Sequence, residues 1–367
     1  MKEDLLFKKV YGSLIGAAIG DAMGGPVEFW DRKDISRVYG RVSGLLEYKH
    51  TITDIHGPWT LHAGSYTDDS RMSKLLCKAV IDAGGPPSTA DVSKVFADYY
   101  YNAPGEMAKG FIEEYFYKAI YGVEKQIFGG HPTNAGVMGI APLGVVSPCD
   151  PVKALADAFS AVFFVEGYAR YSAAICAAAI SSAMRLDADP ESVVKDSLDA
   201  VASHKILREG VIWRSHGMYE GIGMKNENLI REVCKLAERH KANAEISDIS
   251  DIYDELDIIL GHQFGADGAE SMAIGFAMFM AAGGDFVKTV EGCVNFGRDN
   301  DSSASFGGAL AGAFCGTDCI PPDWIATVES ADPGPSFCDL AMEICSIIRS
   351  RHEAHREVAD NLQMLIR

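Results

Sequence analysis

Long apolar runs are missing from this chain of 367 residues, although 48% of them are hydrophobic. No run approaches the roughly 20 residues that a membrane-spanning helix needs. We therefore expect no membrane contact. The N-terminus imitates a signal peptide, but Asp21 interrupts its apolar segment where a cleavage site would lie. The sequence predicts a cytoplasmic protein whose first helix belongs to the fold.

Positive charge is also scarce. The chain has 33 lysines and arginines against 51 aspartates and glutamates, which gives a net charge of −18. A surface this acidic repels phosphate backbones, so nucleic acid is excluded as a bulk partner. A small anionic substrate would need local cations to hold it. The sequence leaves the oligomeric state open.

The C-x-x-C pairs that bind metals or exchange disulfides are absent, and the nine cysteines are an odd number. In a chain long enough to bury a large core, we interpret them as reduced, small apolar residues. The spacing of Cys315 and Cys319 also suits a metal or redox pair. We rank that interpretation below simple burial.

Alternating β patterns are nearly absent, and helical spacing of apolar residues recurs along the whole chain. No repeat or linker divides it, so we predict one all-α domain over 1–367, with a charged peripheral insertion or lid at 225–257. The expected helices are 5–19, 69–83, 89–101, 109–121, 154–165, 168–184, 190–202, 228–244, 268–282, 286–296 and 337–366.

Two stretches lack periodicity. The first, 28–67, begins with Glu28 and is rich in glycine, and we expect a mobile loop that gates the site. The second, 129–144, reads GGHPTNAGVMGIAPLG and is also predicted to be a loop. It lacks the spacing and the lysine of a phosphate-binding P-loop.

The most informative stretch is 295–316, NFGRDNDSSASFGGALAGAFCG. Its small residues predict a tightly packed helix, because glycines without such packing would each cost about 1 kcal/mol. Asp299, Asp301 and Ser302 then stand at the helix N-terminus. Carboxylates two residues apart share a site only if the preceding turn aims them together. Such a turn offers oxygen ligands for Mg²⁺, Mn²⁺ or Ca²⁺, and the alternative is a simple helix cap.

A second acidic cluster stands at another predicted helix start. Thr67, Asp68, Asp69 and Ser70 precede the apolar positions of 72–80. Helix capping explains one threonine or aspartate. Two adjacent carboxylates and a hydroxyl are more than a cap requires. The layout repeats that of Asp299, Asp301 and Ser302, which favours a shared site.

Four motifs occur in a characteristic order: GDAMGGPVE at 20–28, YTDDS at 66–70, NAGVMGIAP at 134–142 and GRDNDSSASFGGALAGA at 297–313. Together they resemble the ADP-ribosylglycohydrolase family. The resemblance implies an orthogonal multi-helix bundle with two divalent metal ions, Mg²⁺ or Mn²⁺. The ligands it implies are Thr67, Asp68, Asp69, Asp299, Asp301 and Ser302. Glu28 matches a glutamate that reaches the metals from a mobile loop in part of the family.

The resemblance also implies an activity, the hydrolysis of an N- or O-glycosidic bond to ribose. The substrate would be an ADP-ribosylated protein or a smaller nucleoside-type glycoside. Glu28, Asp69 and Asp299 are the catalytic candidates, and the sequence does not choose the general base among them. The residues implied to bind substrate are Asn134, Gly136, Met138 and Arg298.

Three departures from the family pattern concern the substrate. Gly139 stands where relatives commonly have arginine. Val165 and Glu166 stand where relatives often have a Thr-His pair. Arg298 stands where many members have glycine. We therefore expect a retained ribose subsite and an altered diphosphate–adenine subsite. Alternatively, Glu166 faces away from the pocket and pairs with Arg170, four residues on.

Two rival functions stay open. The chain could be a non-catalytic relative, since some lens crystallins resemble this family, or a plain metal-stabilised helical protein. The first rival does not explain why six metal-binding side chains are present together. The second predicts that metal changes the melting temperature without supporting turnover.

Overall fold

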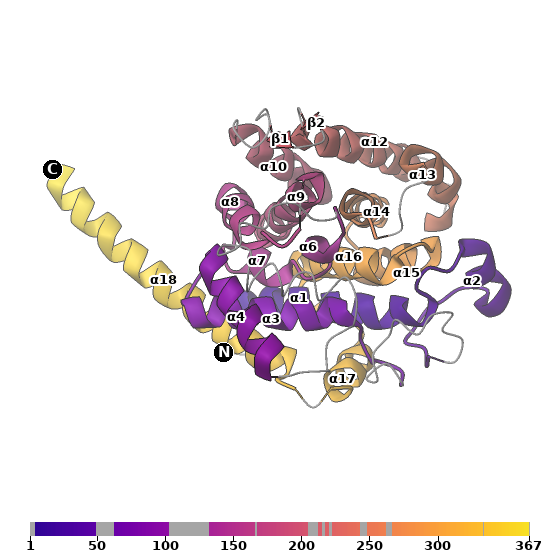
Figure 1. The fold of residues 1–367 in the computed structure, drawn as a ribbon, viewed down its shortest axis with the longest axis horizontal. Helices are drawn as coiled ribbons and strands as arrows, with labels where there is room; N and C mark the ends of the chain where they lie inside the picture. Colours follow the sequence, from indigo (N-terminus) through magenta and orange to yellow (C-terminus); the bar gives the residue numbers. More distant parts are fainter. Residues whose placement is uncertain are drawn as a thin grey trace.

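The computed structural model describes residues 4–48, 62–102, 132–165, 167–204, 212–214, 217–219, 222–242, 248–261, 266–332 and 334–366. These residues fold into a helical bundle (Figure 1). The helices are α1 (Leu5–Gly24), α2 (Arg32–Tyr39), α3 (Asp68–Ala83), α4 (Thr89–Asn102), α6 (Ala135–Met138), α7 (Ala141–Val145), α8 (Pro151–Ala161), α9 (Gly167–Ala183), α10 (Pro190–Ser203), α12 (Ile222–Ala242), α13 (Tyr253–Leu260), α14 (Gly268–Ala281), α15 (Phe286–Phe296), α16 (Asn300–Cys315), α17 (Pro322–Ser330) and α18 (Phe337–Ile366).

Short 3-10 turns are present at η1 (Gly25–Val27), η2 (Ile249–Ile252) and η3 (Thr317–Cys319). The predicted all-α class is confirmed. Among the described residues, one antiparallel hairpin of β1 (Ile212–Arg214) and β2 (Gly217–Tyr219) is the exception. No helix in the described ranges is both long and apolar enough to cross a membrane.

Helices α1 and α16 lie at the centre of the bundle with their backbones in contact. A Cβ added to Gly312 would lie 2.0 Å from the carbonyl oxygen of Gly12, and one added to Gly308 would lie 2.1 Å from that of Gly16. Further along, a Cβ on Gly20 would lie 2.0 Å from the carbonyl oxygen of Ala304. Only glycine permits so close an approach. The order of these contacts makes the two helices antiparallel.

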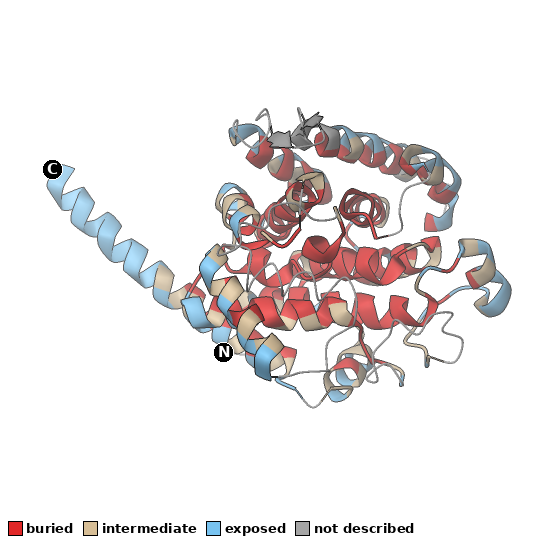
Figure 2. Ribbon diagram, viewed as in Figure 1, coloured by how far each residue is buried: buried red, intermediate tan, exposed pale blue. Residues whose placement is uncertain are grey.

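Figure 2 shows both central helices buried along most of their length. Every residue of α16 from Asn300 to Ala313 is buried, including its polar first turn. Because the helices are antiparallel, the C-terminal end of α1 lies beside the N-terminal end of α16. A Cβ on Gly24 would lie 2.4 Å from the Cα of Asp301. The fold therefore brings motifs from opposite ends of the chain together.

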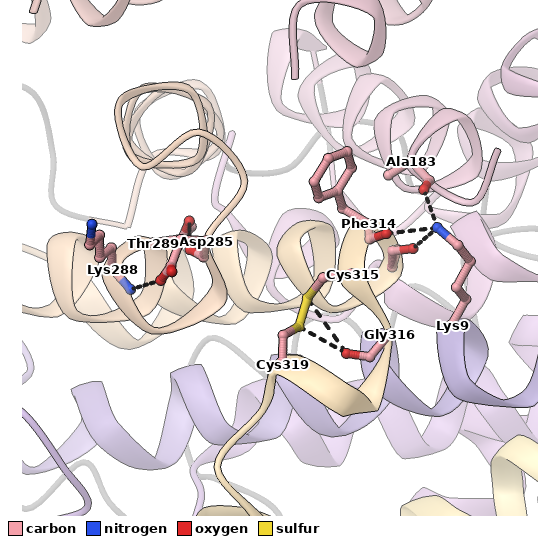
Figure 3. The surroundings of a disulfide bond; sticks show 10 residues. Lys9, Ala183, Asp285, Lys288, Thr289, Phe314, Cys315, Gly316 and Cys319 are labelled. Carbon is pink, nitrogen blue, oxygen red and sulfur yellow. Dashed lines mark hydrogen bonds between the residues drawn. A yellow bond between two sulfur atoms is a disulfide. The ribbon is translucent and has the colours of Figure 1, made fainter. Parts of the chain in front are cut away.

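A buried lysine and a disulfide lie at the opposite, C-terminal end of α16 (Figure 3). The Lys9 Nζ donates to the carbonyl oxygens of Ala183, Ala313 and Phe314, the ends of α9 and α16. Burial lowers the pKa of Lys9 to about 8. These carbonyls are among those that a helix leaves without an intrahelical partner. Lys9 is therefore a side-chain cap shared by two helices.

The prediction that all nine cysteines are reduced is wrong at two positions. Cys315 and Cys319 form a disulfide, with 6.2 Å between their Cα atoms. Gly316 has φ +76°, which ends α16 and turns the chain into η3. That turn brings the two Cα atoms within disulfide range. The other seven cysteines are free, and most of them are buried as predicted.

Most predicted helices occur close to their expected bounds, and those of α15 and α18 agree at both ends. The expected helix at 109–121 lies outside the described residues. Span 225–257 contains most of α12 and α13, and α12 buries Ile230, Val233 and Leu236 in the core. That this span is an insertion or a lid, and that the chain is one domain, stay predictions.

Both predicted loops contain helices. Helix α2 lies within 28–67, begins after the cap Asp31, and buries only Ile35. A single buried residue leaves no apolar period in the sequence. Residues 49–61 of that loop lie outside the described part, so its mobility stays a prediction. The glycine-rich stretch forms α6 and α7, which are buried on all sides and so show no period either.

The contact between α1 and α16 predicts a large cost for one added methyl group. Gly308→Ala should lower the free energy of unfolding by about 2–3 kcal/mol, because the new Cβ meets the backbone of Gly16. Urea unfolding followed by circular dichroism measures this. Gly44→Ala is the control, since nothing lies within 4 Å of its added Cβ. Equal stabilities of the two variants would contradict the contact.

Candidate metal centre

Asp21 joins the end of α1 to the start of α3. Its carboxylate accepts hydrogen bonds from the backbone N and Oγ1 of Thr67, at 2.9 and 2.8 Å. It also accepts from the backbone N and Oγ of Ser70, at 2.9 and 2.6 Å. Asp21 is fully buried, so these four donors replace the hydrogen bonds that water would otherwise give its carboxylate. They fix the orientation of the first turn of α3, which carries Asp68 and Asp69.

The turn before α16 aims its carboxylates as the sequence required. Gly297 and Arg298 both have positive φ, at +84° and +66°. Arg298 is one of few non-glycine residues in that region of φ, where a side chain costs energy. After this turn, Asp299 accepts a hydrogen bond from the Asn134 Nδ2 at 3.1 Å. Asp301 accepts one from the backbone N of Ser302 at 2.9 Å.

The segment that carries Glu28 is bound to the same turn. The backbone N of Phe29 donates to the carbonyl oxygen of Arg298 at 2.7 Å, and the N of Arg298 donates to that of Trp30 at 3.1 Å. Phe29 also has a positive φ, +61°. This pairing places Glu28 directly beside Asp299.

The outcome is a cluster of oxygen atoms from three separate segments. One carboxylate oxygen each of Glu28, Asp299 and Asp301 lies within 4.8 Å of the other two. The Thr67 Oγ1 lies 3.4 Å from the Oδ2 of Asp69 and from that of Asp301. The structure thus brings both predicted acidic clusters and Glu28 to one place.

Burial and mutual repulsion raise the pKa values of these carboxyl groups. Burial is the first cause for Asp69 and Asp301, whose pKa values lie well above the ordinary range, and neighbouring carboxylates add to it. Glu28 behaves likewise, with Asp299 and then Asp68 as its strongest charged neighbours. The pKa of Asp68 rises to about 7 through burial and then the charge of Asp21. A positive charge at the cluster would offset this repulsion and lower the pKa values again.

The donor set fits hard divalent cations. All the clustered donors are oxygens, the ligand type that Mg²⁺, Mn²⁺ and Ca²⁺ prefer. Within the described part of the chain, the Asp69 Oδ1 is a buried oxygen with no hydrogen-bond partner. A buried carboxylate oxygen normally has one. A cation would supply the interaction that this oxygen lacks.

Comparison with known proteins identifies the family. The model of the ADP-ribosylglycohydrolases matches residues 1–356. The chain belongs to the ADP-ribosylglycohydrolase family. It is 24% identical over 327 residues to the ADP-ribosyl-dinitrogen reductase glycohydrolase of Rhodospirillum rubrum, covering 88% of this chain and 90% of that one. It is also 24% identical over 337 residues to an ADP-ribosylhydrolase of Homo sapiens, covering 87% and 88%.

A solved structure of an ADP-ribosylglycohydrolase-related protein complex has the same fold, with a TM-score of 0.63. The match covers 95% of this chain and 100% of the other at 18% identity, so it shows the fold alone. Enzymes of the ADP-ribosylglycohydrolase family hydrolyse the glycosidic bond of ADP-ribose.

The four residues predicted to bind substrate in this member of the family occupy different surroundings. The Asn134 Nδ2 lies at the acidic cluster and donates hydrogen bonds to the Asp299 Oδ2 and the Ser271 Oγ. Gly136 packs against α9, and Met138 is buried beside Ser302. The Arg298 guanidinium donates to Glu270, Asp257 and the carbonyl oxygen of Gly261. Their roles in substrate binding stay predictions.

Sequence reasoning missed two carboxylates at this centre. Asp21 was noted only as a break in an apolar segment, although a charge within a glycine-spaced helix face is itself a signal. Glu270 lies three residues after the cap Asp267, a position at which a glutamate usually completes a cap. Instead it is 1% exposed and accepts from Arg298, and its pKa rises to about 7, chiefly through burial.

The raised carboxyl pKa values predict an unusual pH dependence for the metal-free protein. Asp68 has an ordinary value of 3.8 and a folded value of about 7. Between these values the folded state binds the proton and the unfolded state does not. The free energy of unfolding in EDTA should therefore fall as the pH rises through this window. Denaturant unfolding at several pH values measures the slope.

Two comparisons sharpen this measurement. Asp68→Asn should flatten the slope, whereas Asp318→Asn, on the exposed surface, should leave it unchanged. Added Mg²⁺ should raise stability most at the high-pH end, where the carboxylates are ionised. Stability that increases with pH across the window in EDTA would be inconsistent with the crowded carboxylates.

Proposed function

We propose that this protein is a divalent-metal-dependent hydrolase that cleaves an N- or O-glycosidic bond to ribose. The observation that carries the proposal is the convergence of Glu28, Asp299 and Asp301 beside Thr67 and Asp69. Family membership supports the reaction class. The rival of a non-catalytic protein does not explain why a buried oxygen of Asp69 lacks a partner.

Six side chains would hold two ions, Mg²⁺ or Mn²⁺: Thr67, Asp68, Asp69, Asp299, Asp301 and Ser302. Bound there, the ions would orient two ribose hydroxyls and polarise the attacking water. Asp21 and Asn134 would not contact the ions but hold the proposed ligands in place. Asp21 orients the first turn of α3, and the Asn134 amide orients Asp299.

Glu28 is our choice for the general base. It is half-buried, whereas Asp69 and Asp301 are each 2% exposed, so Glu28 can meet a water molecule that arrives from solvent. Cleavage breaks the bond between the anomeric carbon and the leaving nitrogen or oxygen through an oxocarbenium-like state. Water adds to that carbon, and the carboxylate takes a proton of the water and can return it to the leaving group. Asp69 and Asp299 are the other candidates for this proton.

The proposed substrate keeps the ribose and differs from ADP-ribosyl-protein beyond it. Gly139, where the family pattern has arginine, is covered by Met72, and a Cβ there would lie 2.8 Å from the Met72 Cγ. Arg298, which directly precedes Asp299, is paired with Glu270 and Asp257. Glu166 lies outside the described residues. The known contacts thus offer little positive charge to a diphosphate.

Asp301→Asn tests the proposed metal site. The substitution removes one negative charge from the centre of the cluster while keeping its shape. We expect loss of Mg²⁺ or Mn²⁺ binding, measured by calorimetry, together with loss of turnover by roughly 10³-fold or more. The assay uses panels of ADP-ribosylated peptides and nucleosides with Mg²⁺ or Mn²⁺ present.

Asp318→Asn is the matched control, since it makes the same change in an exposed pair with Lys8. It should leave metal binding and turnover within about twofold of the unmodified protein. Full metal content with full activity in Asp301→Asn would show that Asp301 is not a ligand of the proposed metal site. Metal binding without turnover on any panel in the unmodified protein would favour the metal-stabilised rival.

The altered subsite predicts weak binding of free ADP-ribose. With Mg²⁺ present, calorimetry should give a Kd weaker than micromolar. If the Glu166 carboxylate repels the diphosphate, Glu166→Gln should tighten binding by roughly tenfold to a hundredfold. The control Glu238→Gln, on the exposed face of α12, should not. A micromolar or tighter Kd in the unmodified protein would refute the altered subsite.

A further inference from the structure

The second half of α18 leaves the body of the protein. Figures 1 and 2 show it projecting as a single helix, and every residue from His352 to Ile366 is exposed. Isolated helices of this length are marginal in water, because helical stability in proteins comes mostly from packing of an apolar face. The projecting half is therefore expected to have a partner.

Its apolar face continues the buried face of the first half. Ile344 and Ile348 pack in the core, and the same helical spacing leads through Arg351 to the exposed residues. We call this exposed row the seam: Ala354, Val358, Leu362 and Leu365. Val358 is 65% exposed and Leu365 is 84% exposed. At 3.6 residues per turn these side chains share one side of the helix.

The opposite side of the projecting half is charged. Glu353, Arg356 and Asp360 cluster there by the same helical spacing, away from the seam. Such a division between an apolar and a charged side is typical of a helix with one side covered. A membrane surface is a poor candidate to cover it, because the charged side mixes both signs and the chain carries −18 overall.

We propose that the seam binds the seam of a second copy of this chain, with the two projecting helices antiparallel. The seam is centred on Val358, since Ala354 and Leu362 lie equally far on either side, and Leu365 has Arg351 as its counterpart at the base of the projecting half. In an antiparallel pair centred there, Val358 meets Val358, Ala354 meets Leu362, and Arg351 meets Leu365. An interface of this kind is self-complementary, as a two-fold dimer requires.

Charge selects the antiparallel orientation. A parallel pair would set Arg351 against Arg351 and His355 against His355, which repel when protonated. It would also bring two bodies of charge −18 side by side. The antiparallel pair places the bodies at opposite ends of the helices. It sets Arg351, whose guanidinium donates to the carbonyl oxygen of Val146 at 3.0 Å, opposite a leucine instead of a second arginine.

A pocket lies where the tip of the second helix would end. It has a volume of about 370 Å³ and lies between the base of the projecting half and the 146–153 turn. Its apolar lining includes Leu6, Val146, Pro148 and Ile348, and its polar lining includes Arg351 and Glu353 from the base of the projecting half. In the antiparallel pair, Leu365 and Ile366 of the second copy reach the level of Arg351. The pocket would take these two side chains.

Sedimentation of the full chain tests the dimer. The mass should rise to twice 39.5 kDa with increasing concentration. Val358→Glu sets two carboxylates against each other on the symmetry axis and should weaken the dimer by roughly tenfold or more. Glutamate has a higher helix propensity than valine, so the helix survives, as circular dichroism checks. Gln363→Glu adds the same charge outside the seam and should leave the dimer intact.

Cross-linking tests the orientation. A mixture of Ala354→Cys and Leu362→Cys proteins should form a mixed disulfide between these positions, identified by peptide mapping, while each variant alone should not. Self-linking of either variant alone would indicate a parallel pair and overturn the proposal. A monomer at all concentrations would also overturn it, and so would unchanged mass in Val358→Glu. Flotation of a monomer with phosphatidylcholine or phosphatidylserine vesicles would instead assign the seam to a membrane.

Discussion

The direct backbone contact between α1 and α16 is the constraint on which the rest of the structure depends. It requires glycine at Gly12, Gly16, Gly308 and Gly312, since a methyl group on any of them would overlap a carbonyl oxygen or the adjoining backbone. Two backbones this close cannot slide by a fraction of a turn without a clash. The register of the helices is thereby fixed, and with it the position of the last turn of α1 against the first turn of α16. The acidic centre lies at that end.

Charge crowding at this centre is tolerated because of the helices that carry it. Asp68 and Asp69 lie in the first turn of α3, and Asp301 lies in the first turn of α16, where the helix dipole stabilises negative charge. Asp21 adds a further carboxylate but is compensated by four hydrogen bonds. The repulsion that remains between the other carboxylates would be reduced by a bound cation. The same crowding of negative charge is what the proposed binding of divalent cations would relieve.

The sequence predicted most of the helices and the two acidic clusters, and the reasons for its failures are physical. The bounds of α15 and α18 were predictable from apolar spacing together with flanking residues such as Gly297. Helix α2 was not, because Ile35 is its one buried residue. The need for a turn that aims Asp299 and Asp301 together was predictable. That Arg298 would adopt a positive φ there was not, since the partners that hold it, Glu270 and Asp257, come from distant segments.

The antiparallel contact of α1 and α16 also bears on how the chain folds. Gly12 and Gly312 lie near opposite ends of the sequence, so the central contact forms only after a very long loop has closed. Contacts of such high contact order form late and slow folding. On the ribosome, α1 emerges long before α16 and presents its glycine face without that partner until α16 has been made. The nascent chain therefore carries Glu28, Asp68 and Asp69 for a long time without Asp299 and Asp301, and cannot assemble the complete acidic centre before α16 has been made.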